Sequence, residues 1–130
     1  MTEGTDQPLI WIGRSEYGRL LRTMDRLVEQ APDVSAFLSR ELNRAIVRPE
    51  GDLPPTIVRM GSRVLFRCDN GVASEWGKLV FPEQLSKEGQ ITIASPLGVA
   101  LLGLREGTRM SYSDAAGNTR WLSVERVLPA

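Results

Sequence analysis

The first half of the 130-residue chain carries two amphipathic segments, and a proline follows each of them. Over residues 15–30, and again over 33–48, apolar side chains recur at spacings of three and four, which is the period of one helix face. The two faces consist of Tyr17, Leu20, Leu21, Met24, Leu27 and Val28, and of Val34, Phe37, Leu38, Leu42, Ala45 and Ile46. Pro32 interrupts helical geometry between them, so the pattern predicts an antiparallel helical hairpin, a short coiled coil, over residues 15–48. Helices of about 15 residues are marginal in isolation, and we therefore expect the hairpin to pack on the rest of the chain.

Small polar residues stand where the predicted helices begin. Ser15 is the expected N-cap of the first helix, and Asp33 or Ser35 is the expected N-cap of the second. In the second half of the chain, the pair Ser95-Pro96 combines a preferred N-cap with a proline at the first helical position. This pair predicts a third, short helix, and Gly103 is the residue expected just after its end.

From residue 57 onward, helical spacing gives way to short β-branched and aromatic runs bounded by turn residues. The predicted strands are 63–68, 76–81, 90–94, 109–113 and 119–128. Asp69-Asn70-Gly71 is a strong signal for a hairpin turn between the first two strands. The sequence thus predicts an α+β chain with a lead-in over 1–14, the helical hairpin over 15–48, a linker over 49–56, and a domain over 57–130 with an antiparallel sheet and one short helix.

The composition excludes several kinds of catalytic and binding site. The chain has no histidine and one cysteine, Cys68, which rules out Ser-His-Asp and Cys-His catalysis, His-ligated metals, multi-Cys zinc sites and intramolecular disulfides. Sixteen basic residues balance sixteen acidic ones, and this zero net charge argues against stable direct nucleic-acid binding. No apolar run approaches the about 18 residues of a membrane span, and residues 1–7 lack signal-peptide features, so we expect a cytoplasmic protein.

Three segments of the second half carry a family resemblance. They are 58–64 (VRMGSRV), 79–82 (LVFP) and, as the most specific of the three, 91–107 (ITIASPLGVALLGLREG). Together they resemble the C-terminal domain of the bacterial Gre transcript-cleavage factors. Residues 41–45, followed by Leu53-Pro54, resemble the shorter Rnk type of this family, whose name refers to the regulation of nucleoside diphosphate kinase. The resemblance extends over residues 10–128 and implies a helical hairpin joined to an FKBP-like α+β domain.

The resemblance also implies a partner and its contact residues. In Gre-like factors the surface around the Ser-Pro turn docks on RNA polymerase at the rim of the secondary channel, and the hairpin enters the channel. The matching residues of this chain are Ser95, Pro96, Leu97 and Gly98. The longer factors use acidic tip residues to help hold a catalytic metal, whereas the acids near the tip of this short hairpin, Glu29 and Asp33, are spread across the turn. We therefore expect a non-enzymatic transcription regulator, with no catalytic residue, metal or cofactor, that competes with longer Gre-type factors.

The sequence leaves other functions open. The family name allows a modulator of the level or activity of nucleoside diphosphate kinase that acts by another route, and the tip acids allow a transcript-cleavage-stimulating factor. An FKBP-like fold allows a peptidyl-prolyl isomerase with Trp76, Phe81, Tyr112 and Trp121 around a pocket, although such aromatics are more often core. Arginines at 19, 22 and 26, and at 40, 44 and 48, form stripes on the two predicted helices. These stripes face either an acidic partner surface or the acids Asp25, Glu29 and Glu41 of their own hairpin.

Overall fold

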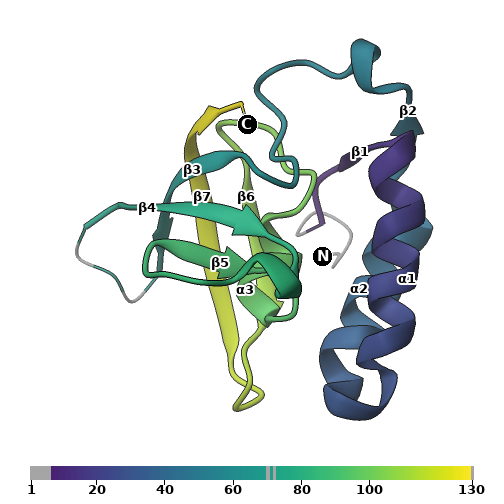
Figure 1. Cartoon of the computed structure of the whole chain (residues 1–130). Coiled ribbons are helices and arrows are strands. Elements are labelled where there is room, and N and C mark those ends of the chain that lie inside the picture. Colours follow the sequence, from purple (N-terminus) through teal and green to yellow (C-terminus); the bar gives the residue numbers. More distant parts are fainter. Residues whose placement is uncertain (1–6, 70, 72, 130) are drawn as a thin grey trace.

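The first half of the chain forms the predicted antiparallel hairpin. The structure, a computed structural model, describes residues 7–69, 71 and 73–129. Helix α1 (Arg14–Gln30) runs down one side of the molecule, and α2 (Pro32–Arg44) returns beside it after a single connecting residue, Ala31 (Figure 1). The Ser35 hydroxyl donates a hydrogen bond of 2.9 Å to the Met24 carbonyl and so links the two helices close to the tip.

The helix starts differ from the prediction. Ser15, Asp33 and Ser35 all lie inside helices, so none of them is an N-cap. Helix α1 begins after Gly13 and α2 after Ala31, and neither of these residues gives a side-chain cap. Pro32 takes the first position of α2, where its fixed φ suits a helix and its missing N–H would have had no intrahelical partner.

A pair of short strands closes the base of the hairpin, and the sequence did not predict it. Strands β1 (Trp11–Gly13) and β2 (Ile46–Arg48) pair in parallel, with Trp11 opposite Ile46 and Gly13 opposite Arg48. The second helix therefore ends at Arg44, and the expected helical positions of Ala45, Ile46 and Arg48 are wrong. Ile46 and Val47 are β-branched, which favours a strand over a last helical turn.

The second half forms a curled five-stranded sheet in the order β5-β4-β3-β7-β6. The strands are β3 (Arg63–Cys68), β4 (Glu75–Val80), β5 (Gln90–Thr92), β6 (Arg109–Ser113) and β7 (Thr119–Leu128), which confirms the predicted set. The predicted turn residue Asn70 lies outside the described residues. The prediction of a fully antiparallel sheet is wrong, because β5 pairs in parallel with β4. The intervening segment 81–89, with the short 3-10 helix η3 (Pro82–Gln84), returns the chain so that β5 starts at the same end as β4. Another 3-10 turn, η2 (Glu50–Asp52), follows β2.

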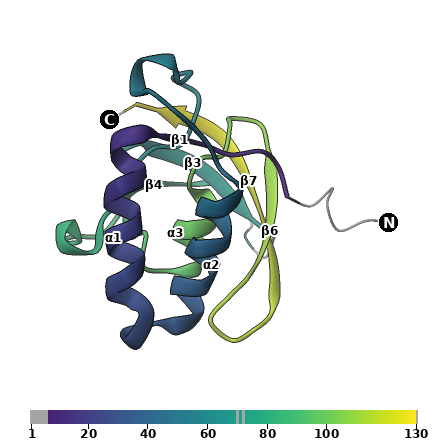
Figure 2. The ribbon, with the colours of Figure 1, turned by 90° about the vertical axis from the view of Figure 1, so that its right-hand side faces the viewer.

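All three α-helices lie on one side of this sheet. Helix α3 (Pro96–Leu101) is sandwiched between the sheet and the hairpin, and α2 packs directly on α3 (Figure 2). One continuous core joins the two halves: Leu20 and Leu38 of the hairpin are fully buried in the same cluster as Phe66 and Leu122 of the sheet. The expectation that the hairpin packs on the rest of the chain is confirmed. Within the described residues, no helix is both long and apolar enough to cross a membrane.

Candidate functional site

The Ser95-Pro96 turn is built as the sequence predicts and is held by side-chain hydrogen bonds. Ser95 is the N-cap of α3, and its hydroxyl accepts a 3.0 Å hydrogen bond from the Gly98 N–H. The same hydroxyl donates to the Thr92 carbonyl at 2.7 Å. The Thr92 hydroxyl in turn accepts from the Ala94 N–H at 3.0 Å. The segment from the end of β5 to the first turn of α3 is therefore a rigid corner, which we call the Ser95–Gly98 corner.

Gly98 fixes how closely α3 approaches β5. A Cβ atom at this position would lie 2.1 Å from the Thr92 carbonyl oxygen and 3.0 Å from the Ile93 Cα, so only glycine fits. At the other end of α3, Gly103 follows the C-cap Leu102 with a φ of +77°, which confirms the predicted helix end. The Gly103 N–H donates to the Val58 carbonyl at 2.9 Å, so both ends of α3 are set by backbone contacts with neighbouring segments.

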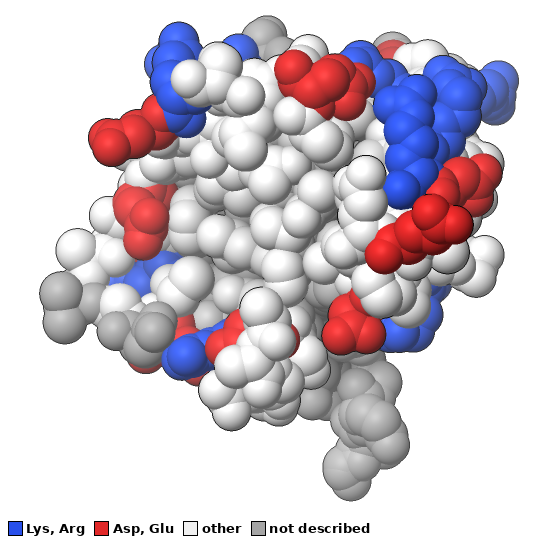
Figure 3. All heavy atoms as spheres, turned by 60° about the horizontal axis from the view of Figure 1, so that its bottom comes forward, with Lys and Arg blue, Asp and Glu red and all other residues white. Residues whose placement is uncertain are grey.

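The four expected docking residues do not have equal access to a partner. Ser95, Pro96 and Leu97 are partly exposed, whereas Gly98 is buried. Gly98 therefore shapes the corner, and the exposed surface of the corner comes from Ser95, Pro96 and Leu97. Pro96 of the corner lines the same groove as Ala31 and Asp33 at the hairpin tip. The tip end of the molecule has an uncharged central area with charged side chains around its margin (Figure 3).

A groove of about 870 Å³ runs beside the corner, between α2 and the β6–β7 hairpin. Pro96 and Phe37 contribute apolar surface to it, and Asp33 and Asp114 contribute carboxylates. Asp33 thus lines the groove, while Glu29 lies exposed in the last turn of α1. Among the described residues, no three side chains of metal-binding type come together at the tip or elsewhere.

The predicted isomerase pocket is not formed by its four expected aromatics. Phe81 is almost fully buried in the core, and Trp76 is 46% exposed on the far side of the sheet. Each of Trp76, Phe81 and Tyr112 lines a different groove, and Trp121 stacks beneath the Arg109 guanidinium, 4.5 Å from it. The isomerase alternative depended on these four aromatics lining one pocket, and they do not.

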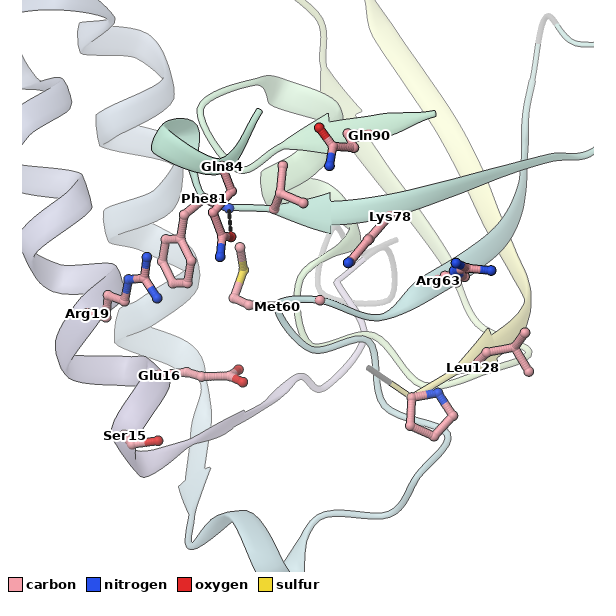
Figure 4. A pocket seen from close by; sticks show the side chains of 13 residues that line it. Ser15, Glu16, Arg19, Met60, Arg63, Lys78, Phe81, Gln84, Gln90 and Leu128 are labelled. Atoms are coloured by element: carbon pink, nitrogen blue, oxygen red, sulfur yellow. Dashed lines mark hydrogen bonds between the residues drawn. The ribbon is translucent and has the colours of Figure 1, made fainter. Parts of the chain in front are cut away.

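A second groove, of about 670 Å³, lies between the start of α1 and the sheet (Figure 4). Arg19 stacks on the Phe81 ring at 3.7 Å and pairs with Glu83 at 2.6 Å across the groove wall. Deeper in, Glu16 pairs with Arg59 at 3.0 Å, and burial raises the pKa of the Glu16 carboxyl in spite of that pair. These contacts join α1 to the domain, so Arg19 pairs with the domain and not with an acid of its own helix.

Two further contacts fix the base of the hairpin. The Glu50 carboxylate, in η2, accepts hydrogen bonds from the Ser15 N–H at 2.7 Å and the Ser15 hydroxyl at 2.5 Å. These bonds lower the pKa of Glu50 to about 2 and satisfy an N–H in the first turn of α1. Arg44 binds Glu41 of its own helix at 2.7 Å and also donates to the Pro8 carbonyl at 2.5 Å. Sequence reasoning missed the Glu50 contact because it joins residues 35 positions apart.

Comparison with known proteins gives a consistent result. A family model described as the C-terminal domain of the transcription elongation factors GreA/GreB matches residues 53–128. The regulator of nucleoside diphosphate kinase from Escherichia coli K12 is 31% identical over 106 residues, which are 78% of this chain and 78% of that protein, and the Shigella flexneri protein of the same name matches to the same extent. A solved structure of a GreA/GreB transcription elongation factor from Nitrosomonas europaea has a TM-score of 0.72 and 29% identity. That match covers 94% of this chain and 99% of the other, so it includes the hairpin as well as the sheet.

Proposed function

Since the chain belongs to the GreA/GreB transcription elongation factor family and is similar to regulators of nucleoside diphosphate kinase, we propose that it is a non-enzymatic transcription regulator that binds RNA polymerase. The observation that carries this proposal is the Ser95–Gly98 corner. Its sequence is the most specific part of the family resemblance, and its hydrogen bonds hold it in one conformation. A preformed contact surface loses little conformational freedom on binding, which favours affinity.

The proposed contact is the corner together with the uncharged surface around it, and the site on polymerase is the rim of the secondary channel. Leu97 and Pro96 supply partly exposed apolar contact area, and the charges around the uncharged end of the molecule would orient the complex. Because Pro96 and the tip residues Ala31 and Asp33 line one groove, a polymerase surface bound at the corner would also meet the tip.

The length of the hairpin favours obstruction of the channel over a catalytic role within it. Helix α1 has 17 residues and is therefore about 26 Å long, and α2 is shorter. The hairpin also lies along α3 for part of this length, which reduces its reach beyond the corner. We propose that the hairpin occupies the channel entrance and excludes longer Gre-type factors.

A competition assay tests this proposal. Core polymerase in a backtracked complex is given a cleavage-stimulating Gre factor, and RNA cleavage is measured with increasing amounts of this protein. We expect cleavage to fall to the unstimulated rate, and we expect this protein alone to stimulate none. Cleavage stimulated by this protein would favour the cleavage-factor alternative. Failure of the wild-type protein to bind core polymerase at physiological salt would refute the proposal.

Two corner variants and one matched control locate the contact. Leu97→Asp places a charge on the apolar surface of the corner, and Pro96→Glu does so at a first-turn position where an acid is compatible with the helix. Both variants should lose competition while their circular dichroism spectra match that of the wild type. Leu128→Asp, the same change at an exposed leucine at the end of β7, should compete normally.

A direct action on nucleoside diphosphate kinase is the second candidate function, and the name of the 31% identical relatives is what favours it. A pull-down with purified kinase, in the absence of polymerase, distinguishes the two proposals. Binding to the kinase that survives Leu97→Asp and Pro96→Glu would place the function on another surface.

A further inference from the structure

The face of the sheet opposite the helices carries cations and an exposed tryptophan. Side chains alternate along β3 and β4, so that Val64, Phe66 and Leu79 are buried in the core while their neighbours point the other way. We call this second surface the outer face. Its members on the central strands include Arg63, Leu65, Trp76, Lys78 and Arg126, together with Arg67, which pairs with Glu125 at 3.5 Å.

Two cations of the outer face stand directly opposite each other. Arg63 on β3 is the register partner of Lys78 on β4, and both are exposed. Among the described residues, neither has an acidic partner within 4.0 Å. Like charges at directly opposed positions destabilise a sheet, so this pair costs stability in the free protein. An anion bound between the two side chains would remove that cost.

Trp76 adds a flat apolar surface beside these charges. It is 46% exposed, lies two residues from Lys78 on the same face, and is the register partner of Leu65. Arg126 is the register partner of Leu65 on its other side, so cation, leucine and tryptophan form a row across three strands. An exposed indole next to cations suits a ligand that combines aromatic rings with negative charge.

A hollow of about 450 Å³ lies beside Trp76 and the Arg63–Lys78 pair, and Leu65 and Arg126 do not line it. Trp76, Lys78, Arg63 and Gln90 line it, and so do Lys87 and the acidic Glu88. The volume is within the range of small-molecule sites and has room for one nucleotide unit. The Gln90 amide oxygen already accepts from the N–H groups of Ser86 and Lys87, at 2.8 and 3.2 Å, which leaves the amide NH2 to donate to the edge of a base.

From this juxtaposition we infer that the outer face binds single-stranded nucleic acid. A base stacks on Trp76, and Arg63, Lys78 and Arg126 contact the adjacent phosphates. A single strand fits better than a duplex, because an exposed indole can stack only on an unpaired base. The zero net charge of the chain predicted no stable nucleic-acid binding. Net charge, however, is a sum over the whole chain, and it hides the grouping of cations without acidic partners on one face.

This site goes beyond the proposed function and is separate from it. Arg63 and Lys78 also line the groove beside the start of α1, but neither lines the groove at the corner. Polymerase docked at the corner therefore leaves the outer face accessible (Figures 1 and 2). The two proposals can therefore fail independently. Polymerase binding is measured without nucleic acid, and nucleic-acid binding is measured without polymerase.

The test is fluorescence anisotropy with labelled oligouridine and oligothymidine of about ten nucleotides, a length within the site sizes of single-strand-binding folds. We expect saturable binding of the wild-type protein with a Kd below about 100 µM at physiological salt, and a weaker interaction with a duplex of the same length. Trp76→Ala should weaken binding between about 5-fold and 150-fold, the range that corresponds to one stacked base. Trp76→Phe, which keeps an aromatic ring, should restore most of the affinity.

The charge arm uses two double variants that change the net charge equally. Arg63→Gln with Lys78→Gln should weaken binding and reduce the slope of log K against log salt by about 1.4, or about 0.7 for each lost phosphate contact. Arg22→Gln with Arg26→Gln, at exposed positions of α1, should leave both affinity and slope close to the wild type. A lower unfolding midpoint would identify any loss that comes from misfolding.

Three results would overturn the inference. The first is no binding of either oligonucleotide by the wild-type protein. The second is an equal loss of affinity in the two double variants, because that would be an effect of net charge alone. The third is a pair of observations: polyglutamate displaces the oligonucleotide from the wild-type protein, and Trp76→Ala binds the oligonucleotide with full affinity. Together they would identify an acidic protein surface as the ligand.

Discussion

Replacing Gly98 by alanine tests whether α3 holds the corner through a close backbone contact. The added Cβ would meet the Thr92 carbonyl oxygen at 2.1 Å and the Thr92 carbonyl carbon at 2.9 Å. Ordinary carbon–oxygen contact needs more than 3 Å, so α3 or the end of β5 must move by about 1 Å. These contacts are with backbone atoms, so no side-chain rotation can relieve them.

The expected energy combines three terms. Overpacking of this kind costs about 1–3 kcal/mol, and displacement of the first turn of α3 weakens the Ser95 cap by a further fraction of about 1 kcal/mol. Alanine has a better helix propensity than glycine by about 1 kcal/mol, which offsets part of the loss. We therefore expect Gly98→Ala to lose about 1–3 kcal/mol of unfolding free energy, or about 4–12 °C in Tm.

Gly18→Ala is the matched control, since it makes the same change inside a helix with free space around it. The nearest atom to a Cβ at Gly18 is the Arg22 guanidinium nitrogen at 3.9 Å. This variant should gain about 0.5–1 kcal/mol. Urea unfolding followed by tryptophan fluorescence measures both variants. A Gly98→Ala protein as stable as the wild type, or a loss in Gly18→Ala equal to that in Gly98→Ala, would refute the reasoning.

Three other perturbations follow from contacts described above. Because the pKa of Glu50 is lowered, the stability that this carboxylate contributes is present above its ordinary pKa near 4.5 and is lost as pH falls toward about 2. Over this pH range the unfolding free energy of Glu50→Gln should therefore decline less than that of the wild type. Parallel curves for the two proteins would contradict the role of Glu50. Leu38→Ala, at a fully buried position of α2, should lower the unfolding free energy by about 2–5 kcal/mol, and the hairpin and sheet of this variant should unfold in one transition. Separate transitions by far-UV circular dichroism and by tryptophan fluorescence would disprove the shared core. At Gly103 a φ of +77° is combined with a Cβ position 2.8 Å from the Ile10 Cβ, whereas Gly117 has a φ of +85° and open space around its Cβ position. Thermal melts should therefore show a larger fall in Tm for Gly103→Ala than for Gly117→Ala. Equal falls would show that the cost of these substitutions comes from backbone conformation alone.

The parts of the fold that the sequence predicts well are those governed by neighbouring residues. The start of α3 follows from Ser95 as N-cap and Pro96 at the first helical position, both of which act within one turn. The hairpin follows from the spacing of its apolar side chains, which is fixed by the 3.6-residue period of the helix. In the same way, the alternation along β3 and β4 places these strands to within one residue.

The features that the sequence does not reveal depend on contacts that only the folded backbone creates. Strands β1 and β2 have three residues each and exist because residues 11–13 and 46–48 meet in space. The carboxylate of Glu50 takes the place expected for Ser15 as the partner of the first turn of α1. The requirement for Gly98 comes from a carbonyl six residues earlier that the turn brings back against α3. In each case the decisive partner lies outside the local window in which propensities act.

The parallel pairing of β1 with β2 holds together the segment that precedes α1 and the segment that follows α2. The rest of the fold therefore does not depend on how far the two helices extend. Adding seven residues to each helix at the tip would advance the tip by about 10.5 Å without altering a contact at the base. A fold with this property can provide obstructing and penetrating proteins from one architecture, through changes in helix length alone.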